Sequence, residues 1–113
     1  MDILSGDKVA KIRELNDNFR TSFRGGQILL TQTVADLPSM VAAAALQKVA
    51  EFTNFNEEND PCEEHDYLSF DLCNREFVFI IQYWNLEIDG PSIDPADPSV
   101  TKRIAILMLI HEW

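Results

Sequence analysis

Two apolar segments separated by a short turn constrain the fold more than any other feature of the sequence. Residues 67–73, YLSFDLC, alternate between apolar and polar side chains, which is the pattern of a strand with one buried face. Residues 76–84, EFVFIIQYW, are apolar on both faces and predict a strand that is covered on both sides. Only residues 74–75 separate the two segments, so we expect the strands to pair with each other.

The rest of the chain adds helices and one more strand to this pair. The expected elements are a helix over 7–23, a strand over 27–34, a helix over 35–52 and a helix over 98–112. The last helix is expected to begin at Asp97 and Pro98, which are typical of a cap and of a first helical position. We therefore predict one α+β domain, residues 1–113, in the order α-β-α-β-β-α. Its helices pack on a small, mostly antiparallel three-stranded sheet.

The charge is strongly negative and unevenly distributed. The formal net charge is −10, and between Val49 and Thr101 a single cation, Arg75, accompanies 13 carboxylates. Direct binding to nucleic acid needs cationic groups that displace counterions, so this class of partner is excluded, as is an anionic membrane surface. The charge allows attraction to a basic partner protein.

Neither a membrane anchor nor a secretion signal is expected. No apolar run approaches the roughly 20 residues of a membrane span. The first residues, MDILSGDKVAKIREL, lack a basic stretch followed by an apolar one. We expect the protein in the cytoplasm of its host cell, where Cys62 and Cys73 remain thiols.

The stretch 54–72, NFNEENDPCEEHDYLSFDL, holds the best candidates for a functional site. It has seven carboxylates and no Lys or Arg, and it includes one of the two histidines. Oxygen-rich loops bind hard cations, and a histidine beside carboxylates suits a transition metal or a general base. The spacing matches no calcium loop and no zinc pattern. A turn whose side chains bond the backbone and hold the loop against the sheet is the structural alternative.

Four segments together resemble a known family. They are KIRELNDNFR, GGQILLTQTVADLP, FNEENDPCEEHDYLSFDL and DPADPSVTKRIAILMLIHEW. In this order they resemble small bacterial proteins grouped as a domain of unknown function. That family usually has Asp-Asn-Asp-Pro, a gap and Glu-His-Asp-Phe, where this chain has residues 58–61 and 64–67. The resemblance implies no activity, but it implies genes carried on plasmids and integrative elements near anti-restriction genes.

The first functional interpretation is a non-enzymatic interaction protein without a cofactor. Its acidic loops would imitate the phosphates of DNA and block the basic groove of a host defence complex. This is an inhibitor of the anti-restriction or anti-CRISPR type. The expected partner-binding residues are Glu57, Glu58, Asp60, Glu63, Glu64, Asp66, Glu87, Asp89 and Asp94. Under this interpretation, residues 54–66 form a partly ordered recognition loop rather than a reaction centre.

Two alternatives remain open from the sequence. The second interpretation is a metal-binding domain or a small metal-dependent enzyme. Its ligands would be Asp60, Glu64, His65 and Asp66. The third is a dimerising accessory protein with no inhibitory role. The arrangement of the carboxylates separates the first two, because a surface for a basic partner spreads them over one face and a metal site brings three or more of them together with His65.

Overall fold

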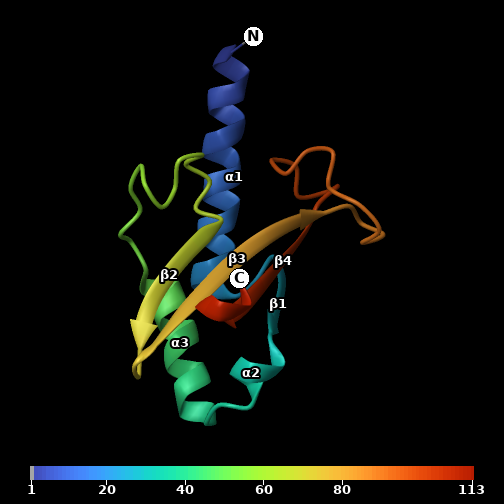
Figure 1. Cartoon of the computed structure of the whole chain (residues 1–113). Coiled ribbons are helices and arrows are strands. Elements are labelled where there is room, and N and C mark those ends of the chain that lie inside the picture. The colour runs from blue at the N-terminus through green and yellow to red at the C-terminus, as the bar shows by residue number, and fades with distance from the viewer. Residues whose placement is uncertain (1) are drawn as a thin grey trace.

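Three α-helices and one four-stranded sheet make up the described part of the molecule (Figure 1). The computed structural model describes residues 2–113, with side chains from residue 6 onward. The elements in chain order are α1 (Asp2–Ser22), β1 (Gly26–Leu30), α2 (Gln32–Ala35), α3 (Ser39–Glu51), β2 (Tyr67–Leu72), β3 (Arg75–Trp84), β4 (Lys102–Leu109) and a 3₁₀ turn, η1 (Ile110–Glu112). Within the described residues, no helix is both long and apolar enough to cross a membrane.

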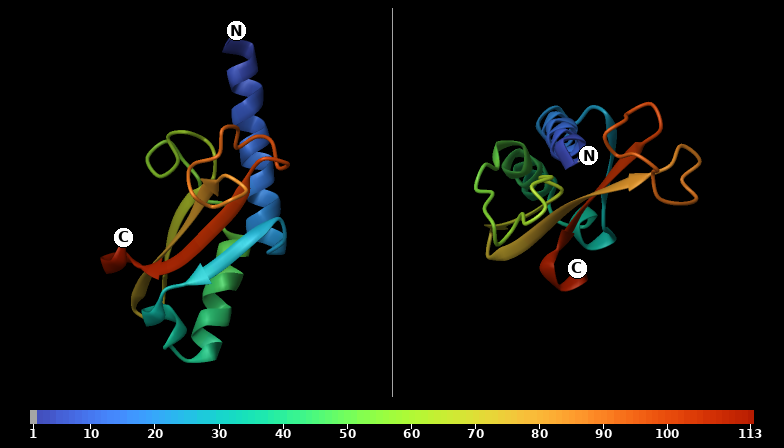
Figure 2. Two further views of the ribbon diagram at one scale, coloured as in Figure 1. Left: turned by 90° about the vertical axis from the view of Figure 1, so that its right-hand side faces the viewer. Right: turned by 90° about the horizontal axis from the view of Figure 1, so that it is seen from above.

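The sheet is mixed, and its strand order is β1-β4-β3-β2. Strand β1 runs parallel to β4, whereas β4 is antiparallel to β3 and β3 to β2. Phe79 lies in the middle, opposite Leu68 of β2 and Leu107 of β4. Helices α1 and α3 cover the same face of the sheet (Figure 2).

The main core fills the space between this face and the two helices. Phe19 of α1 and Val49 of α3 pack there with Phe77, Phe79 and Leu107 of the sheet. All five side chains are at most 1% exposed. Burial of large apolar side chains of this kind is the dominant favourable contribution to folding.

A smaller apolar cluster lies on the opposite face of the sheet. It consists of Val78, Ile80 and Met108, with Tyr67 packed against its edge. The ring of Trp113 lies 5.6 Å from the ring of Tyr67, so the carboxyl terminus contributes to this cluster. The central strands are therefore buried on both faces.

The predicted fold class is wrong in its last element and in its sheet. Residues 98–112 do not form a helix, because 102–109 form β4, which pairs with β1 on one side and β3 on the other. The sheet is therefore four-stranded and mixed, not three-stranded and mostly antiparallel. The apolar residues 104–109 of this strand, mostly buried on both faces, have the same pattern as a helix that is apolar all round.

The residues expected to cap that helix form a turn instead. The carboxylate of Asp97 accepts hydrogen bonds from the amide of Ser99 at 2.9 Å and from its hydroxyl at 2.7 Å. The helix expected over 35–52 begins later than expected, because α3 starts at Ser39, after Pro38. The strand expected over 27–34 ends at Leu30, and residues 32–35 form the short helix α2 instead. Proline lacks an amide hydrogen and its ring disfavours a helical conformation in the preceding residue.

The pairing of the two central apolar segments is confirmed. Strands β2 and β3 form an antiparallel hairpin in which Leu72 lies opposite Arg75. The turn is Cys73–Asn74, one residue earlier than expected, and both residues have positive φ angles of 53° and 62°. Two left-handed residues in sequence suit the twist of a two-residue hairpin, and Asn tolerates this conformation well. Cys62 and Cys73 are both free and exposed.

Candidate functional site: two acidic loops beside helix α1

Two acidic loops lie at one end of the sheet. The first, residues 53–66, joins α3 to β2, and the second, residues 85–101, joins β3 to β4. Since β2 begins where its hairpin partner β3 ends, both loops come to the end opposite the Cys73–Asn74 turn. Helix α1 passes between them (Figure 1).

The first loop is ordered by its own asparagines. The side-chain oxygen of Asn56 accepts hydrogen bonds from the amides of Glu58, at 2.9 Å, and Asn59, at 3.0 Å. In return, the side-chain oxygen of Asn59 accepts one from the amide of Asn56 at 2.8 Å. Such bonds replace the backbone pairing that a loop lacks. The loop therefore has a defined shape before any partner binds.

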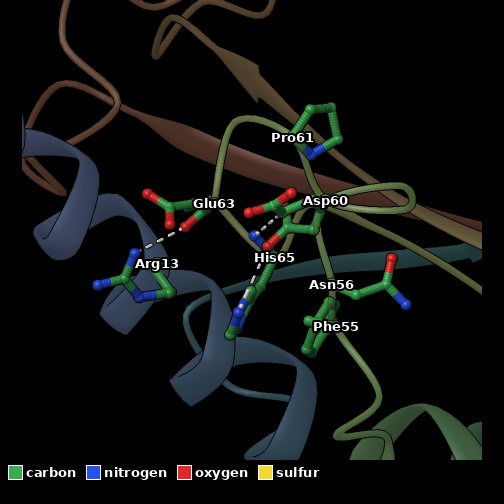
Figure 3. A pocket seen from close by; sticks show the side chains of 8 residues that line it. Arg13, Phe55, Asn56, Asp60, Pro61, Glu63 and His65 are labelled. Atoms are coloured by element: carbon green, nitrogen blue, oxygen red, sulfur yellow. Dashed lines mark hydrogen bonds and ion pairs between the residues drawn. The ribbon is translucent and has the colours of Figure 1, made fainter.

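His65 anchors this loop to α1. Its Nδ1 lies 2.9 and 3.0 Å from the two carboxylate oxygens of Asp17, and its Nε2 lies 3.4 Å from Oδ2 of Asp60. Its ring stacks on Phe55 at 3.7 Å between centroids. Asp60 is only 6% exposed, and its Oδ1 accepts a hydrogen bond from the His65 amide (Figure 3). Both ring nitrogens and one ring face are thus occupied, as in an anchoring residue rather than a free general base.

Two arginines of α1 reinforce the anchor. The guanidinium of Arg20 donates to Asp17 at 3.0 Å and to the carbonyl oxygen of Val49 at 2.9 Å, and its Cζ lies 5.0 Å from the centre of the Phe55 ring. Arg13 donates to the carbonyl oxygen of Glu63 at 2.9 Å. Arg20 is 5% exposed, so it connects α1, α3 and the loop inside the protein.

A second buried network lies under the end of the loop. Arg103 of β4 donates to the side-chain oxygen of Asn16 at 2.8 Å, and the Asn16 amide donates to the Tyr83 hydroxyl at 2.8 Å. That hydroxyl donates to the Glu64 carboxylate at 2.7 Å. Burial and the bond to Glu64 raise the pKa of Tyr83, and burial lowers the pKa of Arg103. Glu64 is therefore held by the fold.

The surroundings of Asp66 disfavour the charged form of its side chain. Burial raises its pKa, and the nearby Glu64 raises it further. Its carbonyl oxygen accepts a hydrogen bond from the amide of Ile81 at 2.8 Å, which begins the pairing of this segment with β3. The residue therefore contributes to the strand entrance through its backbone, while its charge costs stability.

The nine acidic residues expected to bind a partner divide into two groups. Asp60 is buried, Glu64 and Asp66 are partly buried, and Asp94 lies 3.6 Å from Lys8. The exposed ones are Glu57, Glu58, Glu63, Glu87 and Asp89. None of these five carboxylates forms an ion pair with a cation of residues 6–113. Exposure to solvent therefore separates these five from the other four residues of the predicted set.

The four predicted metal ligands do not converge. Asp60 and His65 are adjacent, but Glu64 points to Tyr83. Over the part of the chain that the structure describes, no group of three or more His, Cys, Asp or Glu side chains is arranged to hold a metal ion.

An open groove of about 670 Å³ lies against the first loop. Its lining combines one cation and two polar groups with three carboxylates and two apolar side chains (Figure 3). The lining residues are Arg13, Phe55, Asn56, Glu57, Asp60, Pro61, Glu63 and His65. The groove therefore indents the surface of the loop next to the exposed carboxylates of Glu57 and Glu63.

Sequence reasoning missed the residues that hold the acidic loop in place. Arg13, Asn16, Asp17 and Arg20 lie at steps of three and four residues and therefore share one side of α1. This polar stripe beside the apolar one is the signal that could have identified them. Arg103 gave no such signal, because it stands beside Lys102 directly before an apolar run, where a charged residue is usually exposed.

The comparisons with known proteins give a family and no function. A family described as a protein of unknown function (DUF3768) matches residues 30–112. No curated protein and no solved structure matches the chain.

Proposed function

We propose that this chain, which belongs to the DUF3768 family of proteins of unknown function, is a non-enzymatic protein that binds a basic surface of a partner protein. The observation that carries the proposal is the group of exposed carboxylates on the two loops beside α1. Glu57, Glu58 and Glu63 lie on the first loop, and Glu87 and Asp89 on the second. Exposed charges of one sign attract a partner of opposite sign and increase the rate of encounter.

The state of His65 supports binding rather than catalysis. A general base needs a free nitrogen within hydrogen-bond reach of the substrate. Both nitrogens of His65 face carboxylates of its own chain, Asp17 and Asp60. The groove beside it therefore supports recognition by shape and charge.

We propose further that the partner is a nucleic-acid-binding complex of a host defence system. Such complexes bind the phosphates of DNA through basic grooves, which an acidic protein surface of fixed shape can occupy. Asn56 and Asn59 fix the shape of the first loop through their own hydrogen bonds. The mobile-element setting implied by the family resemblance fits an inhibitor of restriction or CRISPR defence.

Capture of the partner is the first experiment. The tagged chain is used to isolate proteins from host lysate, and the captured protein is identified by mass spectrometry. A fluorescent DNA duplex is then bound to the purified partner and titrated with the chain. We expect displacement of the duplex, with an apparent affinity that falls steeply as salt rises, because screening weakens surface charges.

A charge-matched pair of variants makes the test specific. Glu57→Gln/Glu58→Gln/Glu63→Gln removes three charges from the first loop, and Glu64 is left because Tyr83 bonds it. The control, Asp36→Asn/Asp71→Asn/Glu76→Gln, removes three exposed charges away from the loops. We expect weaker displacement by the first variant only. Equal displacement by both variants would show that the acidic loop is not the binding surface.

A further inference from the structure

Strand β1 leaves one edge of the sheet open. It is the first strand in the order β1-β4-β3-β2, and no other helix or strand of residues 2–113 lies in front of it (Figure 2, left). The amide of Thr31 donates to the carbonyl oxygen of Leu107 in β4 at 3.1 Å. Since backbone groups alternate in direction along a strand, Gly26, Ile28 and Leu30 point their N–H and C=O groups away from β4.

This edge lacks the usual protection against pairing. Natural edge strands carry charges, prolines or bulges that prevent another strand from adding to them. The sequence of β1, GQILL, has no charge and no proline. Leu29 and Leu30 are 42% and 37% exposed. A pairing partner would cover these side chains as well as satisfy the backbone.

Charges of opposite sign mark the two ends of the edge. At its amino end lie Arg24, two residues before the strand, and Lys102, whose neighbour Arg103 pairs with Gly26. At its carboxyl end lie Asp36 and Glu112, and Glu112 accepts a hydrogen bond from the Thr31 hydroxyl at 2.9 Å. An edge with this polarity is complementary to a copy of itself in the antiparallel direction.

We propose that two copies of this chain associate through β1, antiparallel about a twofold axis at Ile28. In this register Ile28 exchanges backbone hydrogen bonds with Ile28 of the second copy, and Gly26 exchanges them with Leu30 of that copy. The two four-stranded sheets join into one of eight strands. The basic end of each edge meets the acidic end of the other.

The same arrangement keeps the acidic loops of the two copies, which repel each other most strongly, far apart. Strand β4 begins directly after the second acidic loop, and β1 runs parallel to β4. The acidic loops therefore lie toward the amino end of β1. An antiparallel pair places the loops of the two copies at opposite ends of the assembly, where two chains of net charge −10 repel each other least.

The mass in solution tests the association. Sedimentation equilibrium of the full chain is expected to give twice the chain mass of 12.9 kDa at high protein concentration. Gln27→Lys/Leu29→Lys places two cations on the exposed side chains of β1 and is expected to give a monomer. Ala43→Lys/Gln47→Lys adds the same charge to exposed positions of α3 and is expected to leave the dimer intact.

Cysteine cross-linking tests the register, in a Cys62→Ser/Cys73→Ser background. Residues 27 and 29 of opposite copies form a non-hydrogen-bonded pair, with Cα atoms about 4.5 Å apart, which a disulfide spans. Gln27→Cys/Leu29→Cys is expected to give a covalent dimer on oxidation, whereas Gln27→Cys alone is not. A monomer at every concentration, a dimer that survives the β1 lysines, or equal cross-linking by the single variant would overturn the proposal.

Discussion

Gly26 lies in β1 between a core side chain of α1 and the backbone of β4. A Cβ atom at this position would lie 2.6 Å from the carbonyl oxygen of Arg103 and 2.8 Å from Cζ of Phe19. Neither group can move freely, because the first belongs to a central strand and the second is a core side chain. We expect Gly26→Ala to lower the free energy of unfolding by about 1–3 kcal/mol in a urea titration.

Gly6 provides the matched control for this substitution. It lies in α1, and a Cβ atom there meets nothing within 4 Å. Alanine is favoured over glycine inside a helix by about 0.5–1 kcal/mol, so Gly6→Ala should leave stability unchanged or raise it. Equal effects of the two substitutions would contradict a close contact at Gly26.

Two aspartates should influence stability in opposite directions. Burial and Glu64 raise the pKa of Asp66, so the folded protein keeps this proton to a higher pH than the unfolded chain does. Stability is then lost as pH rises above the ordinary value of 3.8 through the raised pKa. We expect Asp66→Asn to increase the melting temperature at pH 7 and to have little effect near pH 3.

Asp97 is the comparison for that pH dependence. Hydrogen bonds from Ser99 lower its pKa, so its contribution is present above 3.8 and is lost as pH falls through the lowered pKa. Asp97→Asn should therefore decrease the melting temperature at pH 7 but not in strong acid. If both substitutions shifted stability in the same direction at pH 7, the surroundings assigned to one of them would be wrong.

The side chains around His65 allow a direct test of the metal interpretation. His65 contacts Asp60 and, in α1, Asp17, and Glu64 accepts a hydrogen bond from Tyr83. A loop held by these contacts needs no ion to keep its shape. We expect the melting temperature to be the same with and without EDTA, and an increase of several degrees on adding Zn²⁺ or Mn²⁺ would favour a metal site.

At the scale of the element, β4 holds the sheet together. It is paired along its whole length with β3 and over residues 103–107 with β1, and its Leu107 is fully buried opposite Phe79. We expect Leu107→Ala to cost about 2–5 kcal/mol of unfolding free energy, because it leaves a cavity in the main core. Ile93→Ala, at a side chain that is 89% exposed, should cost almost nothing.

Hydrogen exchange can distinguish a central strand over residues 102–109 from the helix that the sequence predicted there. With β4 as an inner strand, its amides and those of β3 should exchange most slowly and together, since they open only on global unfolding. Amides of β1, which have a partner on one side only in the single chain, should exchange faster. Fast exchange throughout 102–109 would contradict the central position of this strand.

A sequence pattern predicted an element correctly where it is compatible with only one type of secondary structure. Strict alternation over 67–73 fits a half-buried strand and nothing else, and the hairpin with β3 is confirmed. The run RIAILMLI fits a buried helix and a buried strand equally, and only the pairing on both sides decides for β4. The second helix was predicted, but its start at residue 35 was placed too early, because α3 begins at Ser39 after Pro38, and the short α2 gave no separate signal.

At the scale of the molecule, the candidate site depends on contacts between distant residues. His65 meets Asp17, which is 48 residues away, and Arg103 meets Asn16, which is 87 residues away. A sequence shows the acidic loop and its composition, but it does not show which helix face holds the loop. For this reason Asp60, Glu64 and Asp66 were expected at a partner surface, whereas the fold uses them partly as anchors.

The net charge of −10 should make the whole molecule sensitive to salt. The screening length falls from about 30 Å at 0.01 M salt to about 8 Å at 0.15 M, so repulsion among the acidic loops weakens across the molecule. We expect the melting temperature to rise over this range. Glu57→Gln/Glu58→Gln should raise it most at the lower salt concentration and reduce its dependence on salt.

Asp7→Asn/Glu14→Gln supplies the control with the same change in charge. Oε1 of Glu14 lies 3.6 Å from Nζ of Lys11, and Asp7 is four residues before Lys11 on the same side of α1, so both carboxylates have a cation on their side of the helix. Removing them takes away attraction together with repulsion, and little gain in stability is expected at any salt concentration. If this control stabilised the protein as much as the loop variant, total charge rather than its concentration on the loops would govern stability. The charge density of the loop would then give no reason to propose it as the surface that binds a basic partner.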